Sequence, residues 1–262
     1  MTARRAAVLG SPIAHSRSPQ LHLAAYRALG LAEWTYERIE CTADQLAPLV
    51  SGLGPEWVGL SVTMPGKFAA LRFADERTAR ADLVGSANTL VRTATGWLAD
   101  NTDVDGVIGA LDGLAPSTAA VLGSGGTAPA AVVALAELGA RDVAVVARSA
   151  ERAAFLVDLG ARCGMTSHWV ELGQPVRGVD VVVNTIPADV VAHFVDTVAP
   201  APVLLDAIYD PWPTPLAAAV ADAGGRVVNG LQMLLNQAFA QVERFTGLPA
   251  PKEAMTAALE RP

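Results

Sequence analysis

The sequence has no long hydrophobic run, which excludes a membrane-spanning helix from the expected elements. No segment approaches the ~18 consecutive apolar residues that a span requires. The apolar stretch 6–10 near the N-terminus is shorter than the roughly 7–15 residues of a signal-peptide core. Cysteine is also scarce, because Cys41 and Cys163 are the only two and lie far apart. We therefore expect reduced thiols and a cytoplasmic location.

Metal-ligand patterns and blocks of like charge are missing as well. The four histidines show no H-E-x-x-H spacing, so we expect no metal site. The net charge is −7 without a run of one sign, which argues against nucleic acid or an anionic membrane as partner. Lysine is rare: of 19 cationic residues only Lys67 and Lys252 are lysines. Lys252 lies in a polar stretch near the C-terminus where solubility explains it, so Lys67 is the candidate for chemistry.

What the sequence does contain is an alternation of strand-like and helix-like segments, with 52% hydrophobic residues over 262 positions. Such alternation predicts an α/β protein with mostly parallel sheets. It breaks near LAPST (114–118) and then restarts. We expect two α/β domains with a cleft between them: a substrate domain with a mostly parallel sheet, and a Rossmann-like NADP domain. The expected bounds are 1–104 plus 236–262 for the first and 105–235 for the second.

The expected elements follow from this alternation. Strands are predicted at 6–9, 34–40, 57–63, 119–123, 142–148, 179–185 and 203–209, with a hairpin formed by 88–93 and 97–102. Helices are predicted at 19–29, 43–50, 66–73, 102–114, 127–139, 151–160 and 230–247.

The segment VLGSGGTAPAA (121–131) follows a predicted strand and opens a helix. Gly123 allows a tight turn, and Gly125 and Gly126 let the backbone approach a pyrophosphate at the helix N-terminus. Thr127 is expected to cap that helix. The context favours a dinucleotide site, and the alternative is a tight turn that binds nothing.

The end of the following strand, VVARSAER, indicates which nucleotide binds. NAD sites usually place an acidic residue there for the ribose 2′-hydroxyl. Here Arg148, Ser149 and Arg152 stand instead, and arginine forks bind phosphate. NADP is therefore predicted, with two solvated arginines as the alternative interpretation.

The segment SVTMPGKF (61–68) brings Lys67 to the end of a strand. Hydride transfer between an alcohol and a ketone moves one proton at oxygen, which a lysine of lowered pKa can supply and an arginine cannot. Asp103 in DNTD opens a helix and could pair with Lys67. The alternatives are a solvated lysine, a helix-cap carboxylate at Asp103, and a simple turn residue at Asn88.

Taken together, these stretches resemble the shikimate dehydrogenase family over nearly the full length. The resemblance is carried by GSPIAHSRSPQLH, SVTMPGK, GSANTL, DNTD, GSGGTA, ARSAER, NTIP, DAIYDPWPTPL and GLQMLLNQ, in this order and spacing. It implies reversible, NADPH-dependent reduction of 3-dehydroshikimate to shikimate, in the pathway to chorismate and the aromatic amino acids. It also implies a small-molecule substrate as the partner and a monomer or homodimer.

The resemblance assigns roles to individual positions. Lys67 and Asp103 match the catalytic pair. Residues matching the substrate site are Ser16, Ser18 and Tyr209 at the carboxylate, with Ser61, Thr63, Lys67, Asn88, Asp103 and Gln237 around the ring. Residues matching the cofactor site are Gly123, Ser124, Gly125, Gly126, Thr127, Ala147, Arg148, Ser149, Arg152, Thr185, Ala207, Gly230 and Met233.

Three positions depart from the family pattern. Ser61 stands where the family usually has asparagine, so its contact with substrate is expected to pass through water. Ala147 also replaces an asparagine, which removes an adenosine contact while Arg148 keeps the charge. Ser124 replaces a common alanine. Rival interpretations are a quinate dehydrogenase using NAD, a non-catalytic regulatory relative and an S-adenosylmethionine-dependent methyltransferase.

Overall fold

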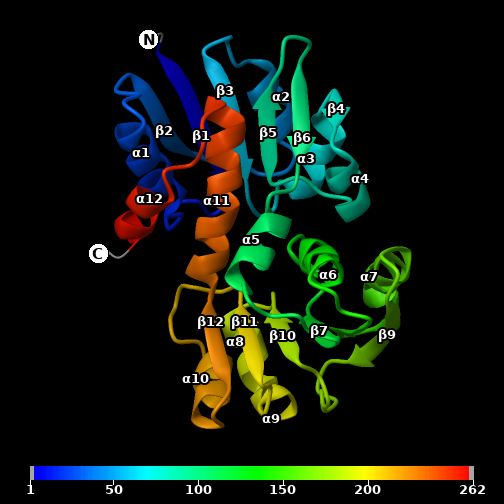
Figure 1. Cartoon of the computed structure of the whole chain (residues 1–262). Helices are drawn as coiled ribbons and strands as arrows, with labels where there is room; N and C mark the ends of the chain where they lie inside the picture. Colours follow the sequence, from blue (N-terminus) through cyan, green and yellow to red (C-terminus); the bar gives the residue numbers. More distant parts are fainter. Residues whose placement is uncertain (1–2, 260–262) are drawn as a thin grey trace. The chain divides into compact units, whose positions relative to one another are not determined.

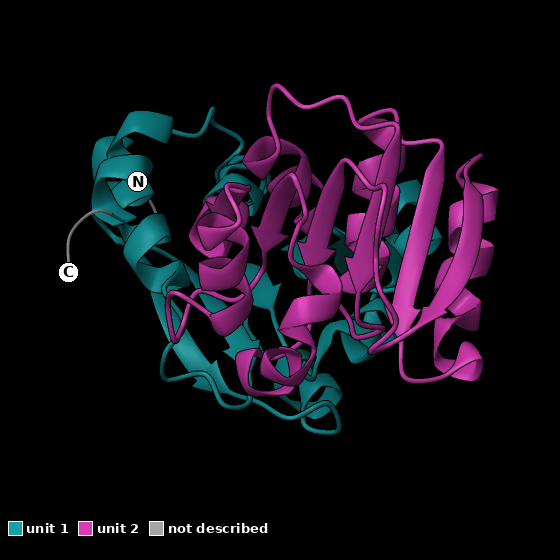
Figure 2. Ribbon diagram, turned by 90° about the horizontal axis from the view of Figure 1, so that it is seen from below, with its two compact units in different colours: residues 1–102, 234–262 teal, residues 103–233 magenta. Residues whose placement is uncertain are grey.

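The computed structural model describes residues 3–259, which form two compact units (Figure 1, Figure 2). Unit 1 comprises Met1–Thr102 and Leu234–Pro262, and unit 2 comprises Asp103–Met233. The second boundary falls inside the long helix α11 (Gly230–Thr246). Each unit has its own six-stranded sheet, which confirms the predicted class of two α/β domains.

The sheet of unit 1 is mixed, with the order β2-β1-β3-β5-β6-β4. β1 pairs in parallel with β2 and β3, and β4 with β6, whereas β3/β5 and the predicted hairpin β5/β6 are antiparallel. As a result, β1, β3 and β6 end at the same edge of the sheet at which β5 begins. The strands are β1 (Arg4–Gly10), β2 (Trp34–Glu40), β3 (Trp57–Val62), β4 (Glu76–Arg77), β5 (Thr89–Arg92) and β6 (Trp97–Asp100).

Helices cover both faces of this sheet. Successive residues of β1 point to opposite faces, so the strand contributes to two apolar cores. Ala7 and Leu9 join one apolar core with α2, α3 and α4, and Ala6 and Val8 join another with α1, α11 and α12. The helices are α1 (Ser18–Ala28), α2 (Leu46–Ser51), α3 (Lys67–Phe73), α4 (Ala79–Val84) and α12 (Lys252–Leu259).

Lys252 has a structural contact in addition to the role in solubility that the sequence predicted. It opens α12, and its Nζ lies 5.3 Å from the centre of the Phe239 ring on α11. The lysine therefore makes a cation–π contact that holds two C-terminal helices of unit 1 together. Its partner is 13 positions away, beyond the reach of a local pattern.

The sheet of unit 2 is parallel throughout, with the order β12-β11-β10-β7-β8-β9. This is the doubly wound Rossmann order, in which winding reverses between β7 and β10. The edge strands β9 and β12 were missed by the sequence prediction, because β9 is mostly exposed and β12 has only four residues, so neither forms an apolar run. The strands are β7 (Thr118–Leu122), β8 (Asp142–Ala147), β9 (Thr166–Glu171), β10 (Val181–Asn184), β11 (Val203–Asp206) and β12 (Arg226–Asn229).

Helices connect the successive strands except β9 and β10, and the apolar core includes Leu122, Val182 and Leu204 from neighbouring strands. Within residues 3–259, no helix is both long and apolar enough to cross a membrane. The helices are α5 (Asp103–Ala110), α6 (Ala128–Glu137), α7 (Ala150–Arg162), α8 (Ala188–Val191), α9 (Val195–Val198) and α10 (Pro215–Asp222), with the 3-10 helix η1 (Ala192–Phe194).

Candidate active site

The predicted substrate residues of unit 1 gather at the edge where β1, β3 and β6 end and β5 begins. The loop after β1 carries Ser16 and leads to Ser18 at the start of α1. The loop after β3 carries Thr63 and leads to Lys67, and Asn88 directly precedes β5. The sheet order thus brings together side chains that are up to 72 positions apart in this part of the chain.

Lys67 is the first residue of α3 and is only 8% exposed. The carbonyl oxygen of Lys67 accepts a hydrogen bond from the Ala87 amide at 3.0 Å, which ties the start of α3 to the segment before β5. Lysine is almost never buried without a polar environment. The alternative of a solvated lysine on a first helical turn is therefore wrong.

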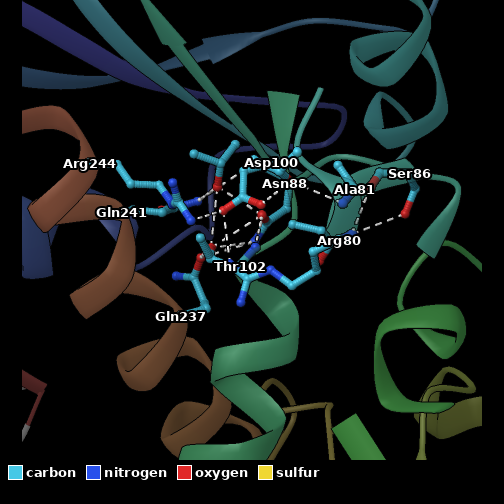
Figure 3. Close-up of polar contacts among 12 residues, drawn as sticks. Arg80, Ala81, Ser86, Asn88, Asp100, Thr102, Gln237, Gln241 and Arg244 are labelled. Carbon is cyan, nitrogen blue, oxygen red and sulfur yellow. Dashed lines mark hydrogen bonds and ion pairs between the residues drawn. The ribbon is translucent and has the colours of Figure 1, made fainter. Parts of the chain in front are cut away.

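Asn88 is a buried hub rather than a turn residue. Its Oδ1 accepts from the Thr102 amide at 2.7 Å and from the Thr89 hydroxyl at 2.8 Å. Its Nδ2 donates to Thr102 Oγ1 at 3.0 Å and to Gln237 Oε1 at 3.3 Å (Figure 3). Gln237 lies on α11 and is also buried. These bonds fix both amides before any ligand arrives.

Asp100, at the end of β6, anchors the DNTD segment. Its carboxylate is fully buried and accepts from Thr78 at 2.6 Å, from Arg80 at 2.9 Å and from Arg244 at 2.6 Å (Figure 3). Burial by itself would raise the pKa of Asp100, but the bonds from Arg80 and Thr78 and the two positive charges outweigh it and lower the pKa. Sequence reasoning missed this cluster because no local pattern connects α4, β6 and α11.

Asp103 follows this anchored segment and opens α5, where it is 6% exposed. The neighbouring Asn101 donates from Nδ2 to the Ser86 carbonyl at 2.9 Å, so the backbone leading to Asp103 is held on both sides. Asp103 is the first residue of unit 2, whereas Lys67 belongs to unit 1. The pairing of these two residues stays a prediction.

The serine-rich loop after β1 is held by hydrogen bonds to β2. Ser11 donates to Glu40 at 2.6 Å, and Glu40 also accepts from the Ile13 amide at 3.2 Å, so Ser11 holds the loop in place. The Ser16 carbonyl accepts from Arg38 Nε at 2.8 Å. Ser18 is buried at the start of α1. The predicted carboxylate contact of Tyr209, in the loop after β11 of unit 2, stays a prediction.

The glycine-rich turn of unit 2 lies at the switch point between β7 and β10. Gly123 has a φ of +104°, and a Cβ there would lie 2.6 Å from Thr185 Oγ1. Thr185 in turn donates to the Leu122 carbonyl at 2.7 Å. Only glycine fits this position. Gly125 faces open space, so its backbone is accessible.

Thr127 occupies the N-cap position of α6, but its side chain does not accept the capping hydrogen bond. The prediction of a side-chain cap is therefore wrong. The N–H groups of the first turn of a helix attract anions when no side chain caps them. Ser124 and Gly126 complete this turn, which fits a pyrophosphate.

Two exposed arginines flank the end of β8. Arg148 follows the strand directly, and Ser149 caps α7 by accepting from the Arg152 amide at 3.4 Å. The Ala147 carbonyl accepts from Trp169 Nε1 at 3.0 Å, which braces the same turn. The guanidinium groups of Arg148 and Arg152 fit a phosphate beyond the pyrophosphate. Among residues 3–259, no group of three acidic, histidine or cysteine side chains could hold a metal ion.

The other predicted cofactor residues lie at or just after neighbouring strand ends. Ala207 follows β11, and Gly230 follows β12 and opens α11, with buried Met233 one turn later. A Cβ on Gly230 would lie 2.5 Å from the Ala207 carbonyl oxygen, so this close approach requires glycine. Sequence reasoning missed the buried Asp206, which accepts from Asn184 at 2.9 Å and from Thr214 at 2.5 Å and so ties these loops together.

Ser61 is 4% exposed and lies within a buried cluster. Its hydroxyl accepts from Tyr36 at 2.6 Å and donates to Gln241 Oε1 at 2.6 Å. The ring of His22 stacks on Tyr36 with centroids 4.0 Å apart. The predicted water-mediated contact of Ser61 with substrate stays a prediction. Sequence reasoning missed this cluster, because Tyr36 and Gln241 lie outside the quoted motifs and His22, which ends the first of them, was given no role.

We expect His22 to make the stability of the protein depend on pH. Complete burial lowers its pKa to about 3, against a smaller opposing effect of the Gln241 hydrogen bond. As the pH falls, the unfolded chain protonates this histidine near its ordinary pKa of about 6.5 while the folded chain does not. The unfolding free energy should therefore fall by about 2 kcal/mol between pH 7 and pH 5.

Urea unfolding of wild type and His22→Phe at both pH values measures this effect. The phenylalanine keeps an aromatic ring beside Tyr36 but cannot titrate, so its unfolding free energy should lose that ~2 kcal/mol of pH dependence. His15→Gln replaces an exposed histidine and serves as the control that keeps the wild-type dependence. An unchanged pH dependence in His22→Phe would contradict the prediction.

A parallel sheet with a glycine-rich turn at its switch point, and no side-chain cap on the following helix, is typical of a nucleotide-binding unit; the buried Lys67 belongs to the other unit. Together they define the class of two-domain, nucleotide-dependent oxidoreductases. A family model described as the shikimate dehydrogenase substrate binding domain matches residues 8–90, and one described as the shikimate 5′-dehydrogenase C-terminal domain matches residues 230–260. The chain belongs to the shikimate dehydrogenase family.

Individual relatives agree with this assignment. Shikimate dehydrogenase (NADP(+)) of Microcystis aeruginosa is 34% identical, over 96% of this chain and 94% of the relative. The crystal structure of Mycobacterium tuberculosis shikimate dehydrogenase shares 71% identity with a TM-score of 0.94, over 98% of this chain and 99% of that one. The Thermus thermophilus enzyme in complex with NADP(H) and shikimate shares 30% identity with a TM-score of 0.84, over 98% and 99%.

Proposed function

We propose that this chain reduces 3-dehydroshikimate to shikimate with NADPH, reversibly, and that Lys67 transfers the proton. The reaction belongs to the pathway that leads to chorismate and the aromatic amino acids, and we place it in the cytoplasm. The observation that carries the role of Lys67 is its burial at the start of α3, beside the edge of the unit 1 sheet where β3 ends. It is one of only two lysines, and the other, Lys252, packs on Phe239.

The chemistry needs a hydride at carbon and a proton at oxygen. When bound, NADPH supplies the hydride that reduces the C3 carbonyl. The Lys67 ammonium gives a proton to the oxygen that becomes the new hydroxyl, and in the reverse direction neutral Lys67 takes that proton back. Asp103 orients the lysine and accepts a hydrogen bond from a ring hydroxyl. General acid–base help of this kind contributes roughly 10²–10⁴-fold to the rate.

The remaining unit 1 residues hold the substrate. Ser16 and Ser18 bind the carboxylate, with Tyr209 assisting. Thr63, Asn88 and Gln237 bind the ring hydroxyls. The bonds that Asn88 makes to Gln237 and Thr102 support this role, because an amide fixed in advance loses little entropy when the substrate binds.

Unit 2 holds the cofactor. The turn from Gly123 to Thr127 binds the pyrophosphate, and Arg148, Ser149 and Arg152 bind the 2′-phosphate. The uncapped α6 N-terminus and the exposed arginines support this assignment. Gly230 and Met233 lie beside the nicotinamide, and Thr185 and Ala207 are further cofactor contacts.

An absorbance assay at the nicotinamide band tests the proposal, with shikimate and quinate each offered with NADP⁺ and NAD⁺. We expect strong turnover only with shikimate and NADP⁺. A preference for quinate or NAD⁺ would instead identify a quinate dehydrogenase and contradict the role of Arg148. A folded protein that turns over none of the four pairs would be a non-catalytic relative.

A further inference from the structure

Gln241 is a buried glutamine on α11 that has no role in the proposed reaction. It lies four positions after Gln237, so the two side chains share one face of the helix. Gln237 is a proposed contact of the substrate ring, and Gln241 is only 1% exposed. The hydrogen bonds of Gln241 lead to Asn88, another proposed contact of the ring (Figure 3).

Both ends of the Gln241 carboxamide are held within unit 1. Its Oε1 accepts from the Ser61 hydroxyl at 2.6 Å and lies 3.3 Å from His22 Nε2. Its Nε2 lies 3.2 Å from the Asn88 backbone carbonyl, which can only accept, so the nitrogen must face that carbonyl. The other hydrogen of Nε2 goes to Thr89 Oγ1 at 2.9 Å. Gln241 has no donor left for a ligand, so it can influence the substrate only through its neighbours.

The bond from Gln241 determines where the Thr89 hydroxyl points. Thr89 is fully buried at the start of β5, and its oxygen accepts from Gln241. The single hydrogen of Thr89 must therefore go to another acceptor. Asn88 Oδ1 is the nearest at 2.8 Å, and Thr102 Oγ1 is farther away at 3.2 Å. Thr89 thus donates to the Asn88 carboxamide.

The backbone and the side chain of Asn88 are held by different groups. The Val62 amide donates to the Asn88 backbone carbonyl at 2.7 Å, so the backbone keeps a donor without Gln241. The side-chain Oδ1 accepts from the Thr89 hydroxyl and from the Thr102 amide at 2.7 Å. These two donors fix the orientation of the carboxamide. An effect of Gln241 on the Asn88 side chain therefore passes through Thr89.

We propose that Gln241 is a positioning residue for substrate binding, which acts through Thr89 on the Asn88 carboxamide. Gln241 orients the Thr89 hydroxyl, and that hydroxyl holds Asn88 Oδ1. The Asn88 carboxamide is then ordered before the substrate arrives, which lowers the entropic cost of binding. Gln237 contacts the ring directly, and Gln241 acts two side chains away. This inference rests on the proposed function, because it takes Asn88 as a contact of the substrate.

Gln241→Met tests this role, because methionine has a similar length but cannot donate to Thr89. The shikimate KM at saturating NADP⁺ should rise about two- to tenfold, the effect of one net hydrogen bond. The kcat should change less, because Lys67 and not Asn88 transfers the proton. The KM for NADP⁺ should stay at the wild-type value, because the proposed cofactor contacts belong to unit 2.

Thr89 variants test the intermediate step. Thr89→Val removes the hydroxyl and should raise the shikimate KM as Gln241→Met does. Thr89→Ser keeps the hydroxyl and should keep the wild-type KM, which loss of packing alone would not predict. In the double variant of Gln241→Met and Thr89→Val, the KM should rise little beyond that of either single variant, because both remove the same bond to Asn88.

His22→Phe is the matched control. It removes a neighbour of Gln241 Oε1 from the same buried region but leaves Nε2 and Thr89 in place. Its shikimate KM should stay near the wild-type value. An increase as large as that of Gln241→Met would overturn the proposal, because any disturbance around the glutamine would then suffice.

The remaining outcomes are equally distinct. An unchanged shikimate KM in Gln241→Met and Thr89→Val would overturn this inference alone, and so would increases that multiply in the double variant. If Gln241→Met does not fold, equal KM values in Thr89→Val and Thr89→Ser would still overturn it. Absence of shikimate turnover in wild type would overturn the proposed function and this inference with it.

Discussion

Lys67→Ala should lower kcat by about 10²–10⁴-fold, while the shikimate KM changes far less. The reason is that alanine leaves the binding side chains in place but removes the group that protonates the carbonyl oxygen. Lys67→Arg should fail to a similar degree, because a guanidinium keeps the positive charge but does not release its proton near neutral pH. Steady-state kinetics in both directions measures these effects.

Two further measurements separate chemistry from structure at this position. Lys252→Ala removes the other lysine, which packs on Phe239 in unit 1, and should keep the wild-type kcat. Added primary amines should partly restore kcat in Lys67→Ala, in step with their basicity, if the missing function is proton transfer. A near-normal kcat in Lys67→Ala would remove this residue from the proposed role.

Arg148→Ala should weaken NADPH binding by about ten- to a hundredfold, the size of lost hydrogen bonds to a charged group. NADH binding should change little, because the only difference between the two cofactors is the 2′-phosphate. The exposed guanidinium at the end of β8 has room for a bidentate contact with such a phosphate. Fluorescence titration with each cofactor gives both dissociation constants without relying on turnover.

Arg141→Ala is the control for this measurement. Arg141 is an exposed arginine directly before β8, whereas Arg148 directly follows it, so the two lie at opposite ends of one strand. Arg141→Ala lowers the net charge equally and should leave NADPH binding near the wild-type value. Equal losses for NADPH and NADH in Arg148→Ala would contradict a 2′-phosphate site.

Sequence reasoning predicted the features that are formed by residues close together along the chain. The turn from Gly123 to Thr127 needs its glycines because of its own backbone geometry, and the strand before it and the helix after it carry local patterns. Lys67 was notable from composition alone. The β5–β6 hairpin was predicted because its strands adjoin in sequence. Backbone conformation and hydrophobic periodicity depend on the residues of a short segment, so they can be predicted from it.

The edge strands of the unit 2 sheet show which features local patterns do not predict. β9 and β12 each lie at an outer edge, where β9 is mostly exposed and β12 has only one buried residue, so neither shows a buried apolar run. Lys252 was misjudged for a related reason, because its partner Phe239 lies on another helix. An edge strand and a lysine that packs on another helix both resemble ordinary polar surface in the sequence, because their partners lie elsewhere in the chain.

The sequence by itself determined the α/β class, and it predicted the nucleotide-binding turn, a phosphate contact at Arg148 and a catalytic role for Lys67. Only the tertiary structure decided that Asp100 takes hydrogen bonds from Arg80 and Arg244, and that buried hydrogen bonds join Tyr36, Ser61 and Gln241. Residue patterns encode which groups are polar or apolar and where the backbone must turn. Which distant polar groups meet depends on the order of strands in a sheet and on where helix α11 returns, and these follow from packing of the whole unit.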